Sequence, residues 1–299
     1  MSTLFLRRIV WSCLIAIIPS CLYAADEAGQ TEPRRPIIPG NLYVADGVVQ
    51  IDQNRALAGG VTGGDGPGFP VTISESGSYR LSGNLIVPDV NTTAIQITAD
   101  SVTLDLNGFS ILGPAVCAVR PTICPSQGTG IGVQAGGDPV VGPRGVRVLN
   151  GSVRGMGSEG ILMTGVGSVV ERVTAYGNAG GGMSVAGSVI QSSAIQNGDF
   201  GIIAVSVRDS SSLENLSDGI IVDASGGVAA GNVSSRNGGY GIFVEYGVAT
   251  GNTVFLSGSY GISSLCPSSI VDNAIQTNGT GSLEIRGSGC VLANNATRP

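Results

Sequence analysis

A short pattern recurs about every twenty residues through the second half of the chain. A unit of about twenty residues is too short for a strand, a helix and their loops, whereas it can hold three short strands joined by turns. The repeat therefore predicts an all-β solenoid. The pattern is a glycine followed mostly by an apolar residue, at Gly160, Gly181, Gly201, Gly219, Gly241 and Gly261.

Asparagines recur on the same interval. In a stack of such units, each strand pairs in parallel with its counterpart in the next coil, about 4.8 Å away. Asparagine tolerates the left-handed backbone of a sharp corner, and stacked asparagine side chains hydrogen-bond along a column. The columns are thus interpreted as structural corners of the solenoid. One contains Asn178, Asn197, Asn215, Asn237 and Asn278, the other Asn232, Asn252, Asn273 and Asn294.

Composition agrees with a packed repeat. Glycine accounts for 48 of 299 residues, yet 42% of residues are hydrophobic and the mean hydropathy is +0.31. These values are too apolar for a flexible glycine-rich linker, and the glycines do not follow the collagen triplet. The glycines are therefore expected to mark turns between short strands.

The ionisable residues exclude several kinds of chemistry. All 15 basic residues are arginine, and there is no histidine. Ser-His triads, histidine metal sites and lysine Schiff bases are therefore excluded. The net charge is −6, and an acidic chain without a basic cluster is a poor ligand for nucleic acid or anionic membranes.

The first 24 residues, MSTLFLRRIVWSCLIAIIPSCLYA, have a charged start, an apolar centre and a small residue at the end. This pattern predicts a cleaved secretory signal peptide (1–24), and hence a secreted or periplasmic protein with no membrane span in its mature form. Lipidation at Cys21 is the alternative. An oxidising compartment favours disulfides between Cys117 and Cys124 and between Cys266 and Cys290; the alternative is four free thiols.

The remaining sequence divides into segments of different composition. Residues 25–40 are a Pro-rich linker, and residues 41–68 are expected to form a flanking arm that caps the first coil, since an open end exposes apolar core and strand edges. The repeat itself is expected over 69–299. Within it, the Gly- and Pro-rich range 113–143 is interpreted as an insertion that projects from the stack.

One upstream stretch carries a family resemblance. The segment GSYRLSGNLIVPDVNTTAIQITADSVTLDLNGFSI, from Gly77 to Ile111, followed by the Gly and Asn repeats, resembles the secreted bacterial right-handed parallel β-helix proteins of the pectin-lyase-like superfamily. The resemblance implies a right-handed parallel β-helix of about ten or eleven coils. That superfamily includes polysaccharide lyases, hydrolases, epimerases and tailspikes. The Gly-His-Gly motif of the hydrolases and the Asp-Pro-His-Asp motif of the epimerases are absent from this sequence.

Aligning the coils on their glycines brings charged residues together. Asp223 and Glu245 fall at the same position of adjacent coils, and Arg286 falls in that column two coils beyond Glu245. Two carboxylates one coil apart match the separation in retaining glycosidases and could instead share a calcium ion. An arginine could neutralise a uronate carboxylate. The alternative is that these are exposed charges that prevent association between molecules.

Aromatic and apolar residues form two further rows. Tyr240 and Tyr260 precede the glycine in adjacent coils, and Tyr246 follows Glu245. Tyrosine rings beside polar groups suit sugar rings, although stacking within a corner explains Tyr240 and Tyr260 equally well. Two residues after each glycine lies an apolar row that is either buried or covered by a partner chain. This row contains Leu162, Met183, Ile203, Ile221 and Phe243.

Three functions are compatible with these residues. The leading hypothesis is an exported protein that binds an extracellular or envelope polysaccharide without necessarily acting on it. The second is a polysaccharide lyase or glycoside hydrolase that acts on an acidic glycan through Asp223, Glu245 and Arg286. The third is a structural or adhesive solenoid whose apolar row binds a protein partner or a second copy of the chain.

Overall fold

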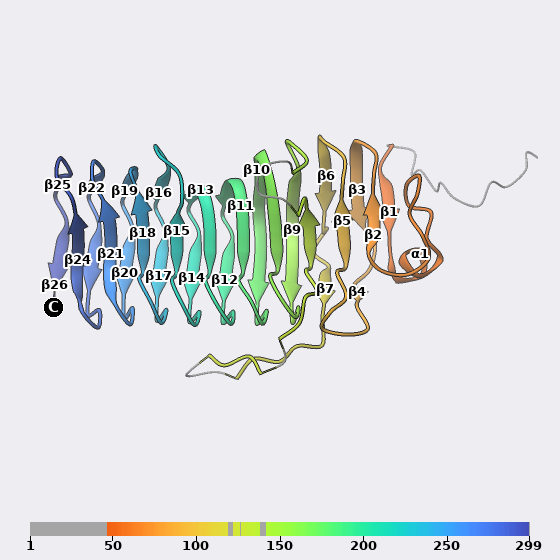
Figure 1. Cartoon of the computed structure of the whole chain (residues 1–299), viewed down its shortest axis with the longest axis horizontal. Helices are drawn as coiled ribbons and strands as arrows, with labels where there is room; N and C mark the ends of the chain where they lie inside the picture. The colour runs from red at the N-terminus through yellow and green to blue at the C-terminus, as the bar shows by residue number, and fades with distance from the viewer. Residues whose placement is uncertain (1–46, 119–121, 126, 138–141, 299) are drawn as a thin grey trace, which may run out of the picture. The chain divides into compact units, whose positions relative to one another are not determined.

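The computed structural model describes residues 47–118, 122–125, 127–137 and 142–298. The predicted signal peptide, the Pro-rich linker and residues 41–46 of the arm lie outside these ranges. Within them, short parallel strands follow one another in a row from β1 to β26 (Figure 1). Among the described residues there is no helix with the length and apolarity that crossing a membrane requires.

The strands form three parallel sheets along about ten coils, which confirms the predicted all-β solenoid. The first sheet contains β2 (Val71–Ile73), β5 (Ile95–Ile97), β8 (Val133–Ala135), the starts of β10 (Ile161–Tyr176), β11 (Met183–Ile190) and β13 (Ile202–Arg208), then β15 (Ile220–Val222), β18 (Ile242–Glu245), β21 (Tyr260–Leu265) and β24 (Gly281–Arg286).

The other two sheets complete each coil. The second contains β1 (Val49–Ile51), β3 (Gly77–Leu81), β6 (Val102–Asp105), the start of β9 (Arg147–Arg154), the middle of β10, the ends of β11 and β13, β16 (Val228–Ala230), β19 (Val248–Thr250), β22 (Ser269–Val271) and β25 (Val291–Ala293). The third contains β4 (Leu85–Ile86), β7 (Ser110–Leu112), the ends of β9 and β10, β12 (Ser193–Ile195), β14 (Ser211–Leu213), β17 (Val233–Ser235), β20 (Thr253–Phe255), β23 (Ala274–Gln276) and β26 (Ala296–Arg298).

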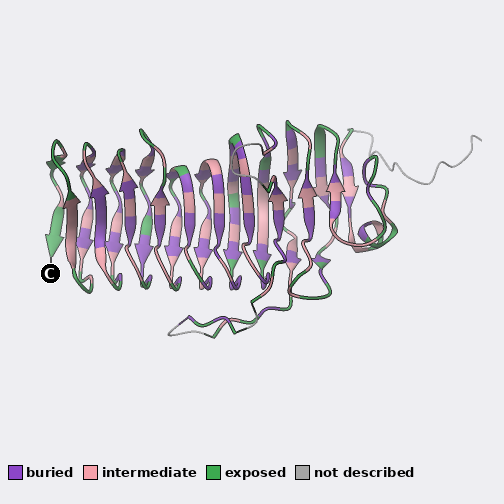
Figure 2. Ribbon diagram, in the orientation of Figure 1, coloured by how far each residue is buried: buried purple, intermediate pink, exposed green. Residues whose placement is uncertain are grey.

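As far as β23, the inward residues of the strands pack in a single core that runs through the coils (Figure 2). Each fully buried aliphatic side chain contributes about 1.5–3 kcal/mol to folding. The inward row of the first sheet is apolar at every coil from β10 to β21, and none of its members is exposed. This row contains Ile161, Met183, Ile202, Ile220, Ile242 and Ile262.

The repeated glycines have a steric cause. A Cβ atom at Gly201 would lie 2.5 Å from the carbonyl oxygen of Gly219, and one at Gly219 would lie 2.5 Å from that of Gly241. The sequence alignment is wrong by one residue at one coil, because Ile161 pairs with Met183 and Gly182 thus replaces Gly181 in the column. The slip places Met183 in the core, whereas the other members of its predicted apolar row face outward.

The first asparagine column forms a buried hydrogen-bonded ladder. The side-chain amide of Asn178 donates to Asn197 Oδ1 at 3.0 Å, Asn197 donates to Asn215 and Asn215 donates to Asn237, both at 2.9 Å. The left-handed residue of each corner is the one before the asparagine, for example Gln196 with φ of 53°. The prediction that asparagine itself supplies this conformation is therefore wrong.

The second column contains Asn232, Asn252 and Asn273, and its final member differs from the prediction. Asn273 donates to Asn295 Oδ1 at 2.9 Å, so Asn295 rather than Asn294 continues the ladder. Asn294 is instead the left-handed residue of that corner, with φ of 52°. One residue of offset at the last coil explains the difference.

The two ends of the described stack differ. At the N-terminal end, α1 (Gln53–Ala58) begins at Asp52, whose carboxylate accepts from the Arg55 N–H at 2.8 Å, and places Ala56 in the core. At the other end, β25 and β26 are exposed along their whole length (Figure 2).

The range 113–143 is not one projecting insertion, because it contains β8, which belongs to a coil. The loop at its start lies along the turns that follow the strands of the third sheet. The Ala115 N–H donates to the Gly155 carbonyl at 2.8 Å, and the Thr122 hydroxyl donates to the Glu214 carbonyl at 2.6 Å. The predicted disulfides are both present, joining Cys117 to Cys124 in this loop and Cys266 to Cys290 near the last coil.

Candidate functional site

The first sheet presents a column of charged side chains on its outward face. Val222 pairs with Val244, so the residues that follow them, Asp223 and Glu245, occupy equivalent positions of adjacent coils. Glu245 pairs with Leu265, and Leu265 pairs with Arg286. The strand register therefore places these residues in one column, in the order expected from the sequence.

The carboxyl groups of Asp223 and Glu245, here called the carboxylate pair, interact directly. A hydrogen bond between their side chains raises the pKa of Glu245, and partial desolvation and the negative charge of Asp223 raise it further. Two carboxyl groups that share a hydrogen bond must share a proton. Glu245 therefore retains its proton to a higher pH than an isolated glutamate would.

Arg286 contacts other residues of the face. Its Nη2 atom donates to Glu284 Oε2 and to the Tyr240 hydroxyl, both at 2.6 Å, and the guanidinium lies 5.8 Å from the centre of the Tyr240 ring. Glu284 also accepts from the Ser263 hydroxyl at 2.8 Å. The Ser263 hydrogen bond, then Arg286, lowers the pKa of Glu284, so this carboxylate stays ionised beside the guanidinium.

The predicted tyrosines have three different environments. Tyr240 stacks on Phe243, with ring centres 6.1 Å apart, and not on Tyr260 as expected. Tyr260 lies over Gly281, in the next coil of the first sheet. Tyr246 is an exposed left-handed residue just past the end of β18, with φ of 52°. Only Tyr240 of the three contacts the charged column.

A hollow of about 230 Å³ adjoins Asp223 on the side toward β10. Its wall includes the outward side chains of Thr164, Ser184, Ala186 and Val205. Because these side chains are short, the surface of the first sheet is recessed beside the carboxylate pair. Hydroxyl groups and small apolar groups thus both line the hollow.

A half-buried acid, Asp218, lies at the turn before β15. Asp218 Oδ1 accepts from the Tyr240 N–H at 2.6 Å, which fixes the turn that carries the Tyr240 ring. Burial raises the pKa of Asp218 above its ordinary value, partly offset by this hydrogen bond, and the charge of Asp199 raises it further.

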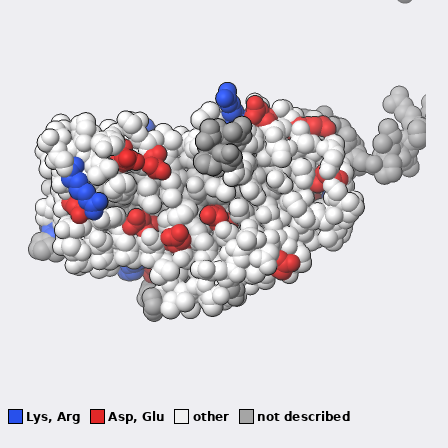
Figure 3. Space-filling view, viewed as in Figure 1, with Lys and Arg blue, Asp and Glu red and all other residues white. Residues whose placement is uncertain are grey.

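Acidic side chains are spread over the side of the stack shown in Figure 3, where basic side chains are few.

The sequence pattern did not predict the roles of Ser263 and Glu284 or the presence of the hollow. Ser263 and Glu284 continue the outward row of Phe243, so the register that aligned Asp223 with Glu245 would also have found them. The hollow depends on side-chain sizes in three coils, one of which was misaligned by the Gly181 error. The repeat therefore could not predict the position of the hollow.

A metal ion would need ligands beyond the carboxylate pair. No cluster of three or more His, Cys, Asp or Glu side chains suited to a metal occurs within the described ranges. Calcium takes about six to eight oxygen ligands, and two carboxylates supply at most four of them. Calcium at Asp223 and Glu245 would thus also need water or ligand oxygens.

Solved structures share this arrangement of coils. The A-module of mannuronan C-5 epimerase AlgE6 from Azotobacter vinelandii is 17% identical, with a TM-score of 0.55 over 74% of this chain and 68% of that module. The fold is the right-handed parallel β-helix. The Dettilon tailspike protein is 14% identical, with a TM-score of 0.45 over 76% of this chain and 51% of that protein.

Likeness at these identities shows the fold alone. The A-module of the mannuronan C-5 epimerase AlgE4 from the same bacterium matches at 13% identity and a TM-score of 0.42, over 75% of this chain and 88% of that module. The sequence matches no protein-family model and no curated protein. The function of this β-helix must therefore be inferred from its own side chains.

Proposed function

We propose that the protein binds a polysaccharide along the outward face of the first sheet. The observation that carries this proposal is the row of apolar and aromatic side chains beside the carboxylate pair and the hollow. Ile203, Ile221 and Phe243 are half-buried and face outward, and Tyr240 extends the aromatic surface of Phe243. Sugars need an apolar surface for their C–H faces and polar partners for their hydroxyls, and this face offers both.

The length of the face suits a polymer. Equivalent outward positions recur about every 4.8 Å along the stack, so the seven coils from β10 to β24 present more than one sugar-sized contact in a line. A small molecule would use one hollow only. The fold is also shared with a module whose name assigns it to mannuronan, which supports a polysaccharide by analogy of fold.

Charge favours an uncharged polymer at the centre of the face. The carboxylate pair and Glu284 are acidic, and Arg286 is already bound to Glu284. A polyanion placed over Asp223 would meet like charge, whereas neutral sugar hydroxyls can donate to carboxylate oxygens. The proposed ligand is therefore a neutral polysaccharide segment.

The same pair supports a second candidate function, a glycoside hydrolase or lyase. Hydrolases that retain configuration use two carboxyl groups, one of them with a raised pKa, and Glu245 has that property beside Asp223. Arg286 lies two coils from Glu245 and pairs with Glu284, so a catalytic role for it would require that contact to break. Binding without catalysis needs no such rearrangement and is the primary proposal.

Export remains part of the proposal. The two disulfides fit an oxidising compartment outside the cytoplasm. An extracellular or envelope polysaccharide is accessible there, and the signal-like residues 1–24 predict the same destination.

The test is a binding screen of the purified mature protein against neutral and acidic polysaccharides, followed by calorimetry on the best ligand. We expect Tyr240→Ala and Phe243→Ala each to weaken binding by about two- to tenfold, since each removes one aromatic contact. Val233→Ala, which removes an exposed apolar side chain on the third sheet, is the control and should change nothing. Failure of every polysaccharide to bind, or a larger effect of Val233→Ala, would overturn the proposal.

Product analysis separates the two candidates. An enzyme would release reducing ends or ultraviolet-absorbing unsaturated sugars, and Asp223→Asn or Glu245→Gln would abolish them. A binding protein would release neither while retaining affinity. Sedimentation of the free protein tests the third hypothesis, because a stable oligomer that Phe243→Glu dissociates would assign this face to protein contact.

A further inference from the structure

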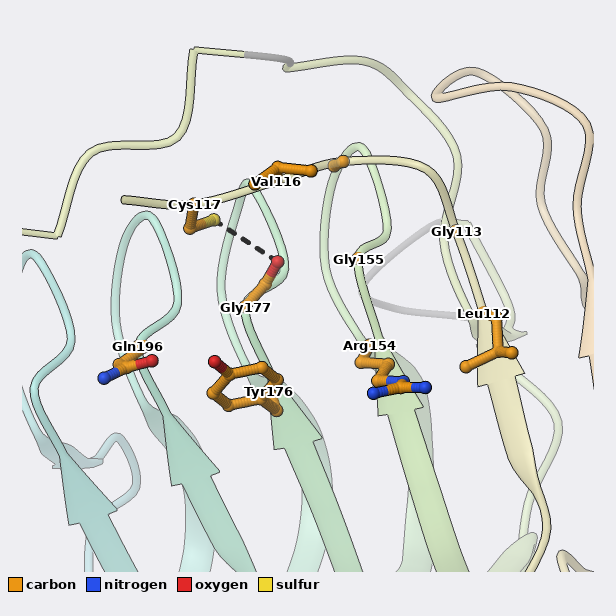
Figure 4. A pocket seen from close by; sticks show the side chains of 10 residues that line it. Leu112, Gly113, Val116, Cys117, Arg154, Gly155, Tyr176, Gly177 and Gln196 are labelled. Atoms are coloured by element: carbon orange, nitrogen blue, oxygen red, sulfur yellow. Dashed lines mark hydrogen bonds between the residues drawn. The ribbon is translucent and has the colours of Figure 1, made fainter. Parts of the chain in front are cut away.

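A second pocket lies on a different sheet, beneath the loop that follows β7. Residues 113–117 of this loop, here called the strap, cross the corners of successive coils (Figure 4). The strap is fixed by the hydrogen bond from the Gly113 N–H to the Arg154 carbonyl, at 2.9 Å, and by the disulfide of Cys117. Together the strap and the third sheet enclose a volume of about 370 Å³, within the range of small-molecule sites.

The floor of this strap pocket is a row of three outward residues. Leu112 pairs with Arg154, and Arg154 pairs with Tyr176, so their side chains occupy one row on adjacent coils. Figure 4 shows the Arg154 guanidinium beside the Tyr176 ring, with Val116 of the strap above them. The row therefore combines one cation, one aromatic face and one aliphatic side chain.

The cation of the pocket is available to a ligand. Across the described parts of the chain, the Arg154 side chain makes no hydrogen bond or ion pair, unlike Arg147, Arg172 and Arg286, which all pair with glutamates. Tyr176 is 42% exposed. The Gln196 amide, at the far end of the pocket, donates to Glu214 Oε2 at 2.8 Å and keeps its own oxygen free to accept.

The strap holds its position without closing the pocket. The Cys117 sulfur lies 3.3 Å from the carbonyl oxygen of Gly177, a contact and not a hydrogen bond, because a disulfide sulfur has no proton. Ala115 and Cys124 pack with Ala179 in a small apolar cluster of their own. Val116 is 71% exposed, so the outer side of the strap faces solvent while the space beneath it stays open.

We propose that the strap pocket binds a sugar residue that carries a carboxylate, such as a uronate, with Arg154 on the carboxylate and Tyr176 on the sugar ring. A guanidinium matches the two oxygens of a carboxylate, and an aromatic ring supplies the flat surface that a bare anion does not use. The site is chemically opposite to the acidic face of the first sheet. It does not depend on the proposed function there.

The test is calorimetric titration of the purified mature protein at low salt with galacturonate, galactose and acetate. Galacturonate should bind at least about tenfold more tightly than either comparison ligand, because only it offers both the charge and the ring. If galactose bound as tightly as galacturonate, Arg154 would have no role in binding. If acetate bound as tightly as galacturonate, the Tyr176 ring would have none. Either result, or no binding of galacturonate, overturns the proposal.

Variants of the pocket residues test whether galacturonate binds in the strap pocket. Arg154→Gln should weaken galacturonate binding by about tenfold or more, and Tyr176→Leu by about two- to tenfold. Arg208→Gln, at an exposed arginine at the end of β13, is the matched control and should leave the affinity unchanged. Circular dichroism must show that each variant is folded. Equal effects of Arg154→Gln and Arg208→Gln would mean that net charge, and not the pocket, attracts the ligand.

Discussion

Asp223 and Glu245 lie at equivalent positions of adjacent coils of the first sheet, where Asp223 raises the pKa of Glu245, although 22 positions separate them in the chain. The parallel register from Val222 to Val244 creates this contact. Because a carboxyl group can only donate while protonated, the contact couples local structure to pH.

Stability near the pair should fall as pH rises. The folded state raises the pKa of Glu245 above its ordinary value of 4.5, so the stabilisation is present below that value and is lost as pH rises through the raised pKa. Glu245→Gln keeps a hydrogen-bond donor and removes the repulsion at pH 7. Its melting temperature should therefore exceed that of the unmodified protein at pH 7, and the difference should disappear at acidic pH.

Glu284→Gln is the matched control for that experiment. The pKa of Glu284 is lowered in the folded state, so its contribution is present at neutral pH and is lost as pH falls through the lowered pKa. The substitution should lower the melting temperature at pH 7. If both variants shift the melting temperature in the same direction, the assigned pKa changes are wrong.

The asparagine ladder should be a main source of stability at the corners. Asn215→Ala removes the acceptor shared by the Asn197 backbone N–H and side-chain amide, so it leaves the buried backbone N–H unpaired and the amide with only the Ala175 carbonyl. We expect a loss of about 2–4 kcal/mol in the free energy of unfolding, measured by denaturant titration. Ser257→Ala, in the same column, should be nearly neutral, because the Ser257 hydroxyl has no hydrogen-bond partner in the described structure.

Steric exclusion explains the glycine column and can be tested directly. Gly201→Ala would place a Cβ atom against Ser212 Oγ and 2.5 Å from the Gly219 carbonyl oxygen, so the coils would have to separate. We expect destabilisation by about 2–4 kcal/mol or failure to fold. Gly66→Ala, where nothing lies within 4 Å of the new atom, should be tolerated. Equal melting temperatures of the two variants would contradict the steric explanation.

The disulfide between Cys266 and Cys290 should hold the last coil in place. It closes a loop of 24 positions, and β25 and β26 beyond it are exposed. Replacing both cysteines by serine should cost about 2–4 kcal/mol and increase hydrogen exchange first in β24 to β26. Replacing Cys117 and Cys124, which close a shorter loop outside the coils, should leave exchange in β24 to β26 unchanged.

Much of the fold was predictable because the sequence repeat determines how the coils stack. The glycine interval specified parallel coils and brought Asp223 beside Glu245, since every rung from β13 to β24 keeps the predicted register. The register failed at Gly181, where the unit is longer by one residue. It also failed at Asn294, for the same reason at the last coil.

The surface was less predictable than the coils. Arg286 turned toward Tyr240 and Glu284 because a long side chain can reach across two coils, and register alone does not fix its direction. The strap pocket depends on a loop whose course the repeat does not encode. Composition showed that the loop was irregular, but not that it lies against Gly155 and Gly177.

The most direct test of polysaccharide binding on the first sheet is a crystal structure with the best neutral oligosaccharide from the screen. We expect sugar density along the outward side chains of β13, β15 and β18, with a ring against Phe243 and hydroxyls at Asp223. Sugar bound only on the second or third sheet, with this face bare, would contradict it.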